Sequence, residues 1–255
     1  MKILRISGNY QRRHIRAYST IAVVCLFSAS ALCLTWVLQF PVYFNFGRYE
    51  FGRGTYTMLF LVIGLLSFKQ YRSYRRGAEG EKQVSSHLGP QLNDDFYLIN
   101  DVMRLDGRGN IDHVILSPSG VFVLETKNNR GKITFYGDNW NYGWSPVYQV
   151  KGNASNIHDM IESSGVLGSR TVPYVIGIVV FPNAQLSFKY EPSTPVLNLS
   201  ELPGYLRNFA NGRTQYSLEE LFKIKDVILN NSDQMDAVEA SFSRILWNDI
   251  RGFFF

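Results

Sequence analysis

An uncharged stretch near the start of the chain constrains the fold most. Residues 19–40 read STIAVVCLFSASALCLTWVLQF and contain no Asp, Glu, Lys or Arg. A helix rises about 1.5 Å per residue, so these 22 residues can cross the roughly 30 Å hydrocarbon core of a bilayer. The stretch therefore predicts a transmembrane helix over residues 19–40.

A second uncharged stretch follows at residues 54–68, GTYTMLFLVIGLLSF. It is short for a full crossing, and a buried helix of a soluble domain is the alternative. Arg53 and Lys69 flank the stretch, and their long side chains can reach the headgroups from a thin span. We therefore expect an N-terminal transmembrane helical hairpin, with a second span over 54–68 and an external loop over 41–53.

The basic residues around the two stretches predict the orientation. Residues 1–18, an expected basic cytoplasmic tail, hold five Lys and Arg, and residues 69–76 hold four, whereas the connecting loop holds two. Basic flanks stay on the cytoplasmic side. We expect a multi-pass protein of the cell (inner) membrane with its soluble domain in the cytoplasm. The small residues 28–31 resemble a signal-peptide cleavage site, but the apolar stretch continues past them.

The net charge of +5 hides an uneven distribution. Residues 1–76 carry 11 of the 26 Lys and Arg but one of the 21 acids, which leaves 15 basic and 20 acidic residues in 77–255. The basic residues therefore belong to the membrane flanks, where they favour anionic lipid. The acidic soluble part has no global positive field, so a polyanionic partner must bind through a local patch or through metal ions.

The soluble part alternates helical and extended patterns, which predicts an α/β domain with a mixed sheet flanked by helices. A short helix is expected within residues 75–89, ended by Gly89-Pro90. The predicted strands cover 96–101, two segments of 110–128, a hairpin around Gly137-Asp138, 174–181 and 195–199. One helix is predicted from Ser145-Pro146 to about Ser164, and a short one after Ser200-Glu201. A third is predicted from the Ser217 and Glu220 capping box through Asn230, and a last one over 233–247.

Three charged residues interrupt the apolar strands of NIDHVILSPSGVFVLETKN, residues 110–128. The turn SPSG, with Pro second and Gly fourth, fits a type I turn. If its first and last residues pair, Asp112 lies opposite Glu125, and Lys127 returns to the same face. The pattern therefore brings two carboxylates and one ammonium group together at the open end of a hairpin.

Two opposed carboxylates repel each other, so this arrangement favours a divalent cation such as Mg²⁺ or Mn²⁺ between them. Such a cation could promote attack of water on a phosphodiester. Lys127 would then orient or help deprotonate the attacking water and stabilise the negative charge that develops at the phosphorus. A glycine bulge at the turn would instead shift the pairing by one residue and place Asp112 and Glu125 on opposite faces. A salt bridge at the edge of the sheet is the alternative without chemistry, although buried charges without a function are costly.

The sequence also resembles a known family, the nuclease-related domain, abbreviated NERD, which is assigned to the PD-(D/E)XK nuclease superfamily. The resemblance covers about residues 77–182, and we expect a NERD nuclease-like domain over 77–185, followed by a mainly helical C-terminal extension over 186–255. It rests on three segments in the expected order: GAEGE (77–81), NIDHVILSPSGVFVLETKN (110–128) and SPVYQ (145–149).

This resemblance implies roles at the matching positions. Asp112 and Glu125 would bind the metal ion, Mg²⁺ or Mn²⁺, with the Thr126 carbonyl as a third ligand, and Lys127 would be the catalytic lysine. Two further catalytic positions are implied: Glu81, which would complete the metal shell directly or through water, and Gln149, which would contact the site or the substrate. The family commonly has Asn-Pro before this glutamine, and here Ser145 replaces the Asn, which puts the helix cap in question.

Several neighbours of these residues have two readings. His113 should face away from Asp112 on an alternating strand and serve packing. The three residues after the lysine could meet a phosphate backbone or form a solvated loop: Asn128, Asn129 and Arg130. Four aromatic residues could stack on bases or pack in the core: Trp140, Tyr142, Trp144 and Tyr148.

The sequence thus predicts a membrane-anchored, Mg²⁺-dependent nuclease that hydrolyses phosphodiester bonds, with DNA as the expected partner beside the lipid bilayer. A non-catalytic nucleic-acid-binding or partner-binding scaffold with a nuclease-like fold is the alternative. A membrane sensor that binds a partner protein through residues 186–255 is a third.

Overall fold

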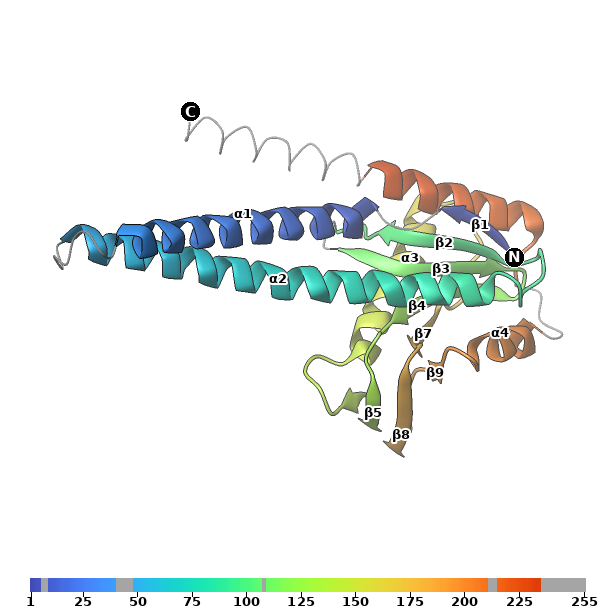
Figure 1. Cartoon of the computed structure of the whole chain (residues 1–255). Helices are drawn as coiled ribbons and strands as arrows, with labels where there is room; N and C mark the ends of the chain where they lie inside the picture. Colours follow the sequence, from blue (N-terminus) through green and yellow to red (C-terminus); the bar gives the residue numbers. More distant parts are fainter. Residues whose placement is uncertain (6–8, 40–47, 107–108, 211–214, 235–255) are drawn as a thin grey trace. The chain divides into compact units, whose positions relative to one another are not determined.

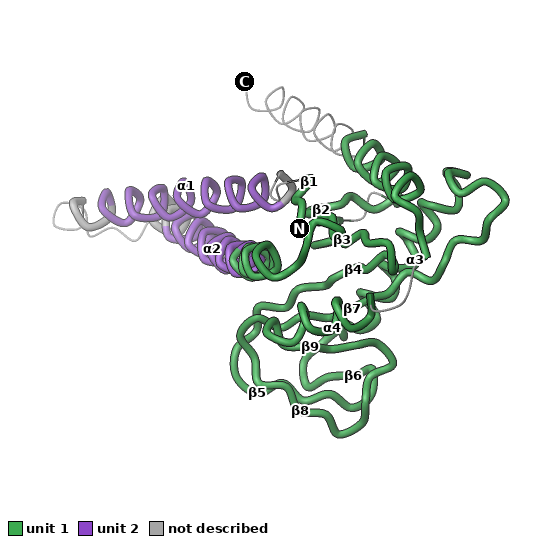
Figure 2. Tube along the Cα trace, turned by 90° about the vertical axis from the view of Figure 1, so that its right-hand side faces the viewer, with its two compact units in different colours: residues 1–8, 79–255 green, residues 9–78 purple. Residues whose placement is uncertain are grey.

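The computed structural model describes residues 1–5, 9–39, 48–106, 109–210 and 215–234 (Figure 1). The chain forms two compact units (Figure 2). Unit 1 consists of residues 1–8 and 79–255, and unit 2 consists of residues 9–78.

Unit 2 contains two long helices, α1 (Asn9–Gln39) and most of α2 (Arg48–Leu88). Within the described parts of the chain, one segment is long and apolar enough to cross a membrane, Gln11–Thr35 of α1, with a mean hydropathy of 1.9. This segment overlaps the predicted span 19–40, and the support comes from length and composition alone. The predicted second span, 54–68, lies inside α2 and does not meet the same criterion.

The two helices of unit 2 contact each other closely. A Cβ atom on Gly64 of α2 would lie 2.9 Å from Cγ of Leu26 on α1, so glycine permits this approach. Tyr74 of α2 stacks on His14 and Tyr18 of α1, with ring centroids 4.9 and 5.6 Å apart. α2 begins at Arg48, inside the loop expected over 41–53, and residues 40–47 lie outside the described part.

The expectation of a separate short helix within 75–89 was wrong. α2 runs unbroken through Gly77 and Gly80 and ends at Leu88, and its residues from Glu79 belong to unit 1. A glycine weakens a helix by about 1 kcal/mol relative to alanine but does not end one. The amphipathic pattern itself was read correctly, because Val84 and Leu88 are both fully buried.

The main sheet of unit 1 has six strands and is mixed (Figure 1). Its order is β1-β2-β3-β4-β7-β9, in which β2, β3 and β4 are antiparallel neighbours and the other pairs are parallel. The strands are β1 (Lys2–Arg5), β2 (Tyr97–Met103), β3 (Asn110–Ser117), β4 (Gly120–Thr126), β7 (Ile176–Phe181) and β9 (Val196–Asn198).

β1 was not predicted, because residues 1–18 were expected to form a basic tail. Lys2–Arg5 instead pairs parallel with β2 and forms an edge of the sheet. The amino group of Met1 donates to the Leu92 carbonyl oxygen at 2.7 Å, which ties the chain end to unit 1. A four-residue strand with two basic side chains carries no apolar alternation strong enough to predict it.

A smaller, three-stranded sheet has the order β6-β5-β8. β5 (Gly131–Tyr136) and β6 (Asn139–Trp140) form the hairpin predicted around Gly137-Asp138. β8 (Ala184–Tyr190) pairs parallel with β5 and was not predicted. Its residues are partly or fully exposed, so the apolar signal of a core strand is missing.

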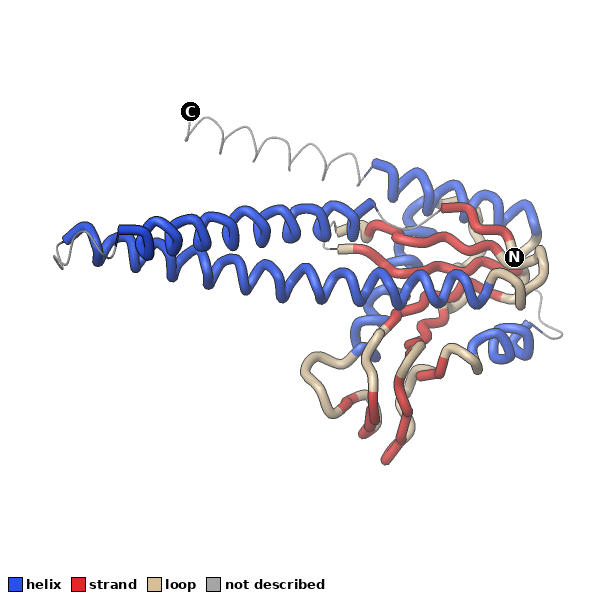
Figure 3. Tube along the Cα trace, viewed as in Figure 1, coloured by secondary structure: helices blue, strands red, loops and turns tan. Residues whose placement is uncertain are grey.

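Helices cover both faces of the main sheet, which confirms the predicted mixed sheet flanked by helices (Figure 3). On one face the core includes side chains of α3 (Pro146–Ser164) and of the helix over 218–234. On the other face it includes the end of α2 and α4 (Leu202–Ala210). Burial on both faces explains the near-continuous apolar sequences of β4 and β7.

The C-terminal capping box was predicted correctly. The Ser217 N–H donates to Glu220 Oε2 at 2.7 Å, and the Glu220 N–H donates to Ser217 Oγ at 3.2 Å. The helix over 218–234 passes through Asn230 without the expected break before residue 233. The predicted helix over 233–247 lies otherwise outside the described residues.

Candidate metal centre at the open end of the β3–β4 hairpin

The β3–β4 hairpin has the register that places the charged residues together. Ser117 pairs with Gly120, and the pairing continues regularly to His113 with Leu124. The loop therefore contains two residues, Pro118 and Ser119. This excludes the alternative register with a glycine bulge, in which the two carboxylates would lie on opposite faces.

The regular ladder ends one residue before Asp112. There the Asp112 side chain replaces a backbone partner: the Thr126 N–H donates to Asp112 Oδ2 at 2.7 Å. β4 continues to pair with β7 at this point, with Glu125 next to Val179. Asp112 therefore fastens the open end of the hairpin while its carboxylate keeps a second oxygen for another partner.

Lys127 connects β4 to α3. Its Nζ donates to Glu125 Oε1 at 2.8 Å and to Gln149 Oε1 at 2.9 Å. Gln149 lies in the first turn of α3, whose N-cap is Ser145: the Val147 N–H donates to Ser145 Oγ at 3.3 Å. Serine thus caps the helix in place of the family's usual asparagine, and Gln149 reaches the lysine.

Glu81 comes from α2 and is buried. The preceding residue, Gly80, lies against β4: a Cβ atom there would be 2.8 Å from Asn128 Cβ and 3.3 Å from Thr126 Cγ2. Only glycine allows α2 to approach this closely, so Gly80 sets the position of Glu81. The Glu81 carboxylate is near enough to change the pKa values of both Asp112 and Lys127.

The ionisable groups of the cluster influence one another strongly. Burial and the neighbouring Glu125 and Glu81 carboxylates raise the pKa of Asp112 well above its ordinary value. Burial also raises the pKa of Glu125, although Lys127 opposes this. Burial lowers the pKa of Lys127, but the three carboxylates outweigh that effect and leave it raised. The site therefore holds an ammonium group among carboxyl groups that resist ionisation together.

The donor atoms suit a hard divalent cation. Two carboxylates at the end of adjacent strands and a backbone carbonyl are oxygen ligands of the kind that Mg²⁺ and Mn²⁺ prefer. A dication would offset both the burial and the repulsion from Glu125 and Glu81 that raise the pKa of Asp112. The carboxylate oxygens of Glu81, Asp112 and Glu125 do not all lie within 4.8 Å of one another; in the described residues that distance is met by His158, Asp159 and Glu162 on the surface of α3.

Comparison with protein families gives one match. Residues 76–182 match the model of the nuclease-related domain. The chain contains a NERD domain. That family is part of the PD-(D/E)XK-like nuclease superfamily. No curated protein and no solved structure matches the chain significantly.

The NERD domain brings together all six residues singled out in the sequence. Asp112, Glu125, Thr126 and Lys127 lie on or next to the hairpin, Glu81 reaches it from α2, and Gln149 reaches it from α3. Since α2 and α3 cover opposite faces of the sheet, the site lies where both faces meet at the strand ends.

Asn153 was missed in the sequence. It is buried on α3, where its Nδ2 donates to Glu125 Oε2 at 3.2 Å. Arg104 Nη1 in turn donates to Asn153 Oδ1 at 2.7 Å. Asn153 therefore fixes the second oxygen of Glu125 while Lys127 fixes the first. The signal available was its position four residues after Gln149, which places both on one helix face.

His113 serves the packing of the NERD domain, as expected. It is fully buried, and its Nδ1 lies 2.7 Å from Asn100 Oδ1. Because a carbonyl oxygen only accepts, Nδ1 carries the proton. Burial lowers the pKa of His113 to about 3, so the ring is neutral. Ser85 Oγ of α2 donates to the same Asn100 oxygen at 3.2 Å.

The residues that follow the lysine are divided between structure and solvent. Asn128 Oδ1 accepts from Asn183 Nδ2 at 2.7 Å, which joins the loop after β4 to the loop after β7. Asn129 is half-buried, and Arg130 is exposed. Arg130 thus remains a candidate phosphate contact, whereas Asn128 has a structural partner.

Proposed function

We propose that this protein is a membrane-anchored, metal-dependent nuclease that hydrolyses phosphodiester bonds of nucleic acid, with DNA as the substrate. The supporting observation is the grouping of Asp112, Glu125 and Lys127 at the open end of the hairpin in a NERD domain. Buried like charges destabilise a fold, so their presence favours a catalytic role.

The proposed ligands of the cation are Asp112, Glu125 and the carbonyl oxygen of Thr126. Glu81 would act through a water molecule, because the three carboxylates do not all come within 4.8 Å of one another. Bound Mg²⁺ or Mn²⁺ would supply positive charge next to the scissile phosphate and acidify a water molecule.

Lys127 would act as a positive charge. Its raised pKa favours the ammonium form, which donates protons in hydrogen bonds and cannot accept one. This supports stabilisation of the negative charge that develops on the phosphate, and not removal of a proton from water. Gln149 would hold Lys127 toward the substrate, given the 2.9 Å bond between them.

A cleavage assay tests the proposal. The full chain in detergent micelles is incubated with linear, circular and single-stranded DNA and with RNA, in Mg²⁺, in Mn²⁺ and in EDTA. We expect cleavage only with the cation, and a loss of at least about 100-fold in Asp112→Asn and in Lys127→Ala, since removal of one charge-stabilising donor typically costs that much. Lys151→Ala is the matched control, because this lysine pairs with Asp138 outside the site.

Two outcomes would contradict the nuclease. One is cleavage that survives in both variants, which would indicate a contaminating enzyme. The other is binding of nucleic acid without cleavage under any cation, which would support the non-catalytic scaffold instead.

Asn153 gives a finer test of the same site. As a positioning residue for Glu125, Asn153→Ala should lower activity about 10- to 100-fold and raise the Mg²⁺ concentration needed for half-maximal rate. A fall in activity with an unchanged Mg²⁺ dependence would show that Asn153 acts elsewhere than on the metal ligand.

For the membrane topology, we propose two spans, 19–40 and 54–68, with the soluble domain in the cytoplasm. The support is the apolar α1 segment, its contact with α2 at Gly64, and the basic flanks. A reporter fused after Phe255 should be active only in its cytoplasmic form. Activity of an extracytoplasmic reporter at that position would show that 54–68 does not span.

A further inference from the structure

Three exposed aromatic residues lie in or just before the first turn of α3, the turn that also carries Gln149. Trp144 is 75% exposed, Tyr142 48% and Tyr148 40%. The rings of Trp144 and Tyr148 are 5.6 Å apart between centroids, inclined by 47°. We call these three residues the aromatic surface. Large apolar side chains with this exposure favour a partner that covers them.

The aromatic surface adjoins the core through Trp140, whose ring centroid lies 5.2 Å from that of Tyr142. Trp140, the fourth aromatic residue of this segment, packs against Phe135 and Phe181 of the main core. Its Nε1 donates to the Gly143 carbonyl oxygen at 3.1 Å, between Tyr142 and Trp144. Packing therefore explains Trp140, and Trp140 in turn holds the segment that presents the exposed rings.

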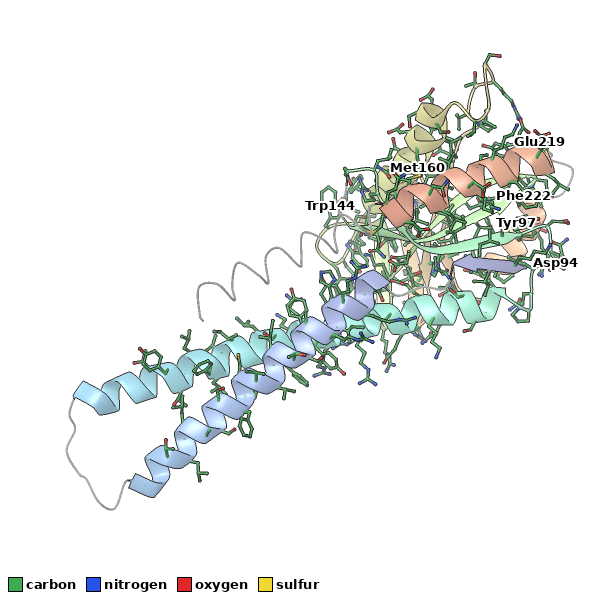
Figure 4. All side chains as sticks on the ribbon, turned by 90° about the horizontal axis from the view of Figure 1, so that it is seen from above. Asp94, Tyr97, Trp144, Met160, Glu219 and Phe222 are labelled. Atoms are coloured by element: carbon green, nitrogen blue, oxygen red, sulfur yellow. The ribbon has the colours of Figure 1, made fainter. Side chains whose placement is uncertain are left out.

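The aromatic surface is linked to the proposed catalytic lysine, Lys127, through the first turn of α3. Tyr148 immediately precedes Gln149, whose Oε1 accepts from Lys127 Nζ. Figure 4 shows Trp144 at one end of unit 1 and Tyr97 at the other. Tyr97 pairs with Leu116 near the hairpin turn, so Trp144 lies toward the open end, where the site is.

Local charge complements this surface. Arg130 and Lys132 are exposed and follow Lys127 along the chain into β5. The remaining soluble part is acidic, so phosphate contacts alone supply little affinity. Stacking on aromatic rings is the other main source of affinity for a single strand, because every base has a flat apolar face.

We propose that the aromatic surface, Tyr142, Trp144 and Tyr148, stacks on unpaired bases, and that the substrate is single-stranded or frayed nucleic acid. This proposal rests on the proposed nuclease function for its substrate. A paired duplex keeps its bases stacked on one another and offers the rings no free face. The strand would run from the aromatic surface past Gln149 to Lys127.

Equilibrium binding to the full chain in detergent, in EDTA so that no cleavage occurs, tests the stacking. The probes are a fluorescent single strand of thymidines, a strand of equal length built from abasic residues, and a blunt duplex. We expect the thymidine strand to bind at least about fivefold more tightly than the abasic strand, and Trp144→Ala with Tyr148→Ala to remove that difference.

Tyr174→Ala is the matched control, because the Tyr174 side chain has the same 75% exposure as that of Trp144. Tyr174 precedes the start of β7, which runs parallel to β4, so it lies toward the hairpin turn and away from the open end. Trp144→Phe should retain most of the preference, since the ring remains. Base-dependent binding in EDTA by a protein that shows no cleavage with Mg²⁺ or Mn²⁺ would overturn the nuclease proposal but leave the stacking proposal standing. Equal affinity for thymidine and abasic strands, or a change of oligomeric state in the double variant by light scattering, would overturn the stacking.

Discussion

The two ends of the β3–β4 hairpin differ in what they contribute. At the turn, paired residues are buried, and the polar atoms of Ser117 and Ser119 satisfy each other at 2.7 Å. At the open end, the Asp112 carboxylate accepts a hydrogen bond from the Thr126 backbone N–H. The Glu125 carboxylate accepts hydrogen bonds from the side chains of Lys127 and Asn153. One end is arranged for stability, whereas the other buries carboxylates close together, so that burial and the neighbouring Glu125 and Glu81 carboxylates raise the pKa of Asp112.

This difference shows how one short supersecondary element can carry both tasks. The apolar half of the hairpin fixes the register, and the register determines which side chains meet at the other end. A strained or charged site persists because the surrounding core holds it in place. Substitutions in the apolar half should therefore mainly lower stability, whereas substitutions of the charged residues at the open end should mainly lower activity.

The largest stability loss is expected in the apolar half. Phe122 is fully buried on β4 and contacts Phe209 of α4 edge to face, at 5.2 Å between centroids. Phe122→Ala should lower the free energy of unfolding by about 3–5 kcal/mol. Thermal unfolding of the full chain in detergent measures it. Phe222→Ala, at an exposed phenylalanine, should cost about 1 kcal/mol or less; equal losses would show that Phe122 is not a core residue.

A pH-dependent effect comes next, from His113. Its folded pKa of about 3 lies below the ordinary 6.5. Between these values the unfolded chain binds a proton that the folded chain does not, so stability falls as pH decreases from 6.5. We expect a loss of roughly 2 kcal/mol by pH 4.5 that His113→Gln lacks. Unfolding of both proteins at pH 7 and 4.5 measures it, and parallel losses would contradict a buried neutral imidazole.

Gly80 tests the close approach of α2 to the open end. Gly80→Ala would place a Cβ atom 2.8 Å from Asn128 Cβ and should destabilise the fold by about 1–2 kcal/mol and lower cleavage, because Glu81 moves. Gly152→Ala, in α3 with nothing within 4 Å, should stabilise by about 0.5–1 kcal/mol. If Gly80→Ala is stabilising as well, the helix does not depend on this contact.

The smallest expected effect is a gain in the free energy of unfolding. Asp112→Asn removes a carboxylate whose raised pKa reflects burial and repulsion, and an amide oxygen can still accept from Thr126. In EDTA its free energy of unfolding should rise by about 1 kcal/mol, whereas with Mg²⁺ its cleavage activity should be lost. Asp138→Asn is the comparison, because Lys151 and Ser193 lower the pKa of Asp138, and its neutralisation should destabilise. A destabilised Asp112→Asn would mean that Asp112 is a structural acceptor alone.

Much of this organisation could be predicted because it is local. The turn SPSG, the Ser145 cap and the capping box at Ser217 each specify their own backbone. The turn left two registers of the hairpin open, and the structure has the one in which Ser117 pairs with Gly120. The features that escaped prediction depend on partners far along the chain. β1 and β8 gain their strand character from pairing with β2 and β5, which their own sequences do not reveal.

The same division applies to the site. The sequence by itself determined a hairpin with two acids and a lysine at its open end, an apolar α1, and a match to the NERD family over residues 76–182. Only the tertiary structure decided that Asn153 supports Glu125, that Gly80 lets Glu81 approach, and which aromatic rings stay exposed. The physical reason is that turn and cap preferences act within a few residues, whereas burial, close approach and pKa shifts arise when α2, β4 and α3 pack together.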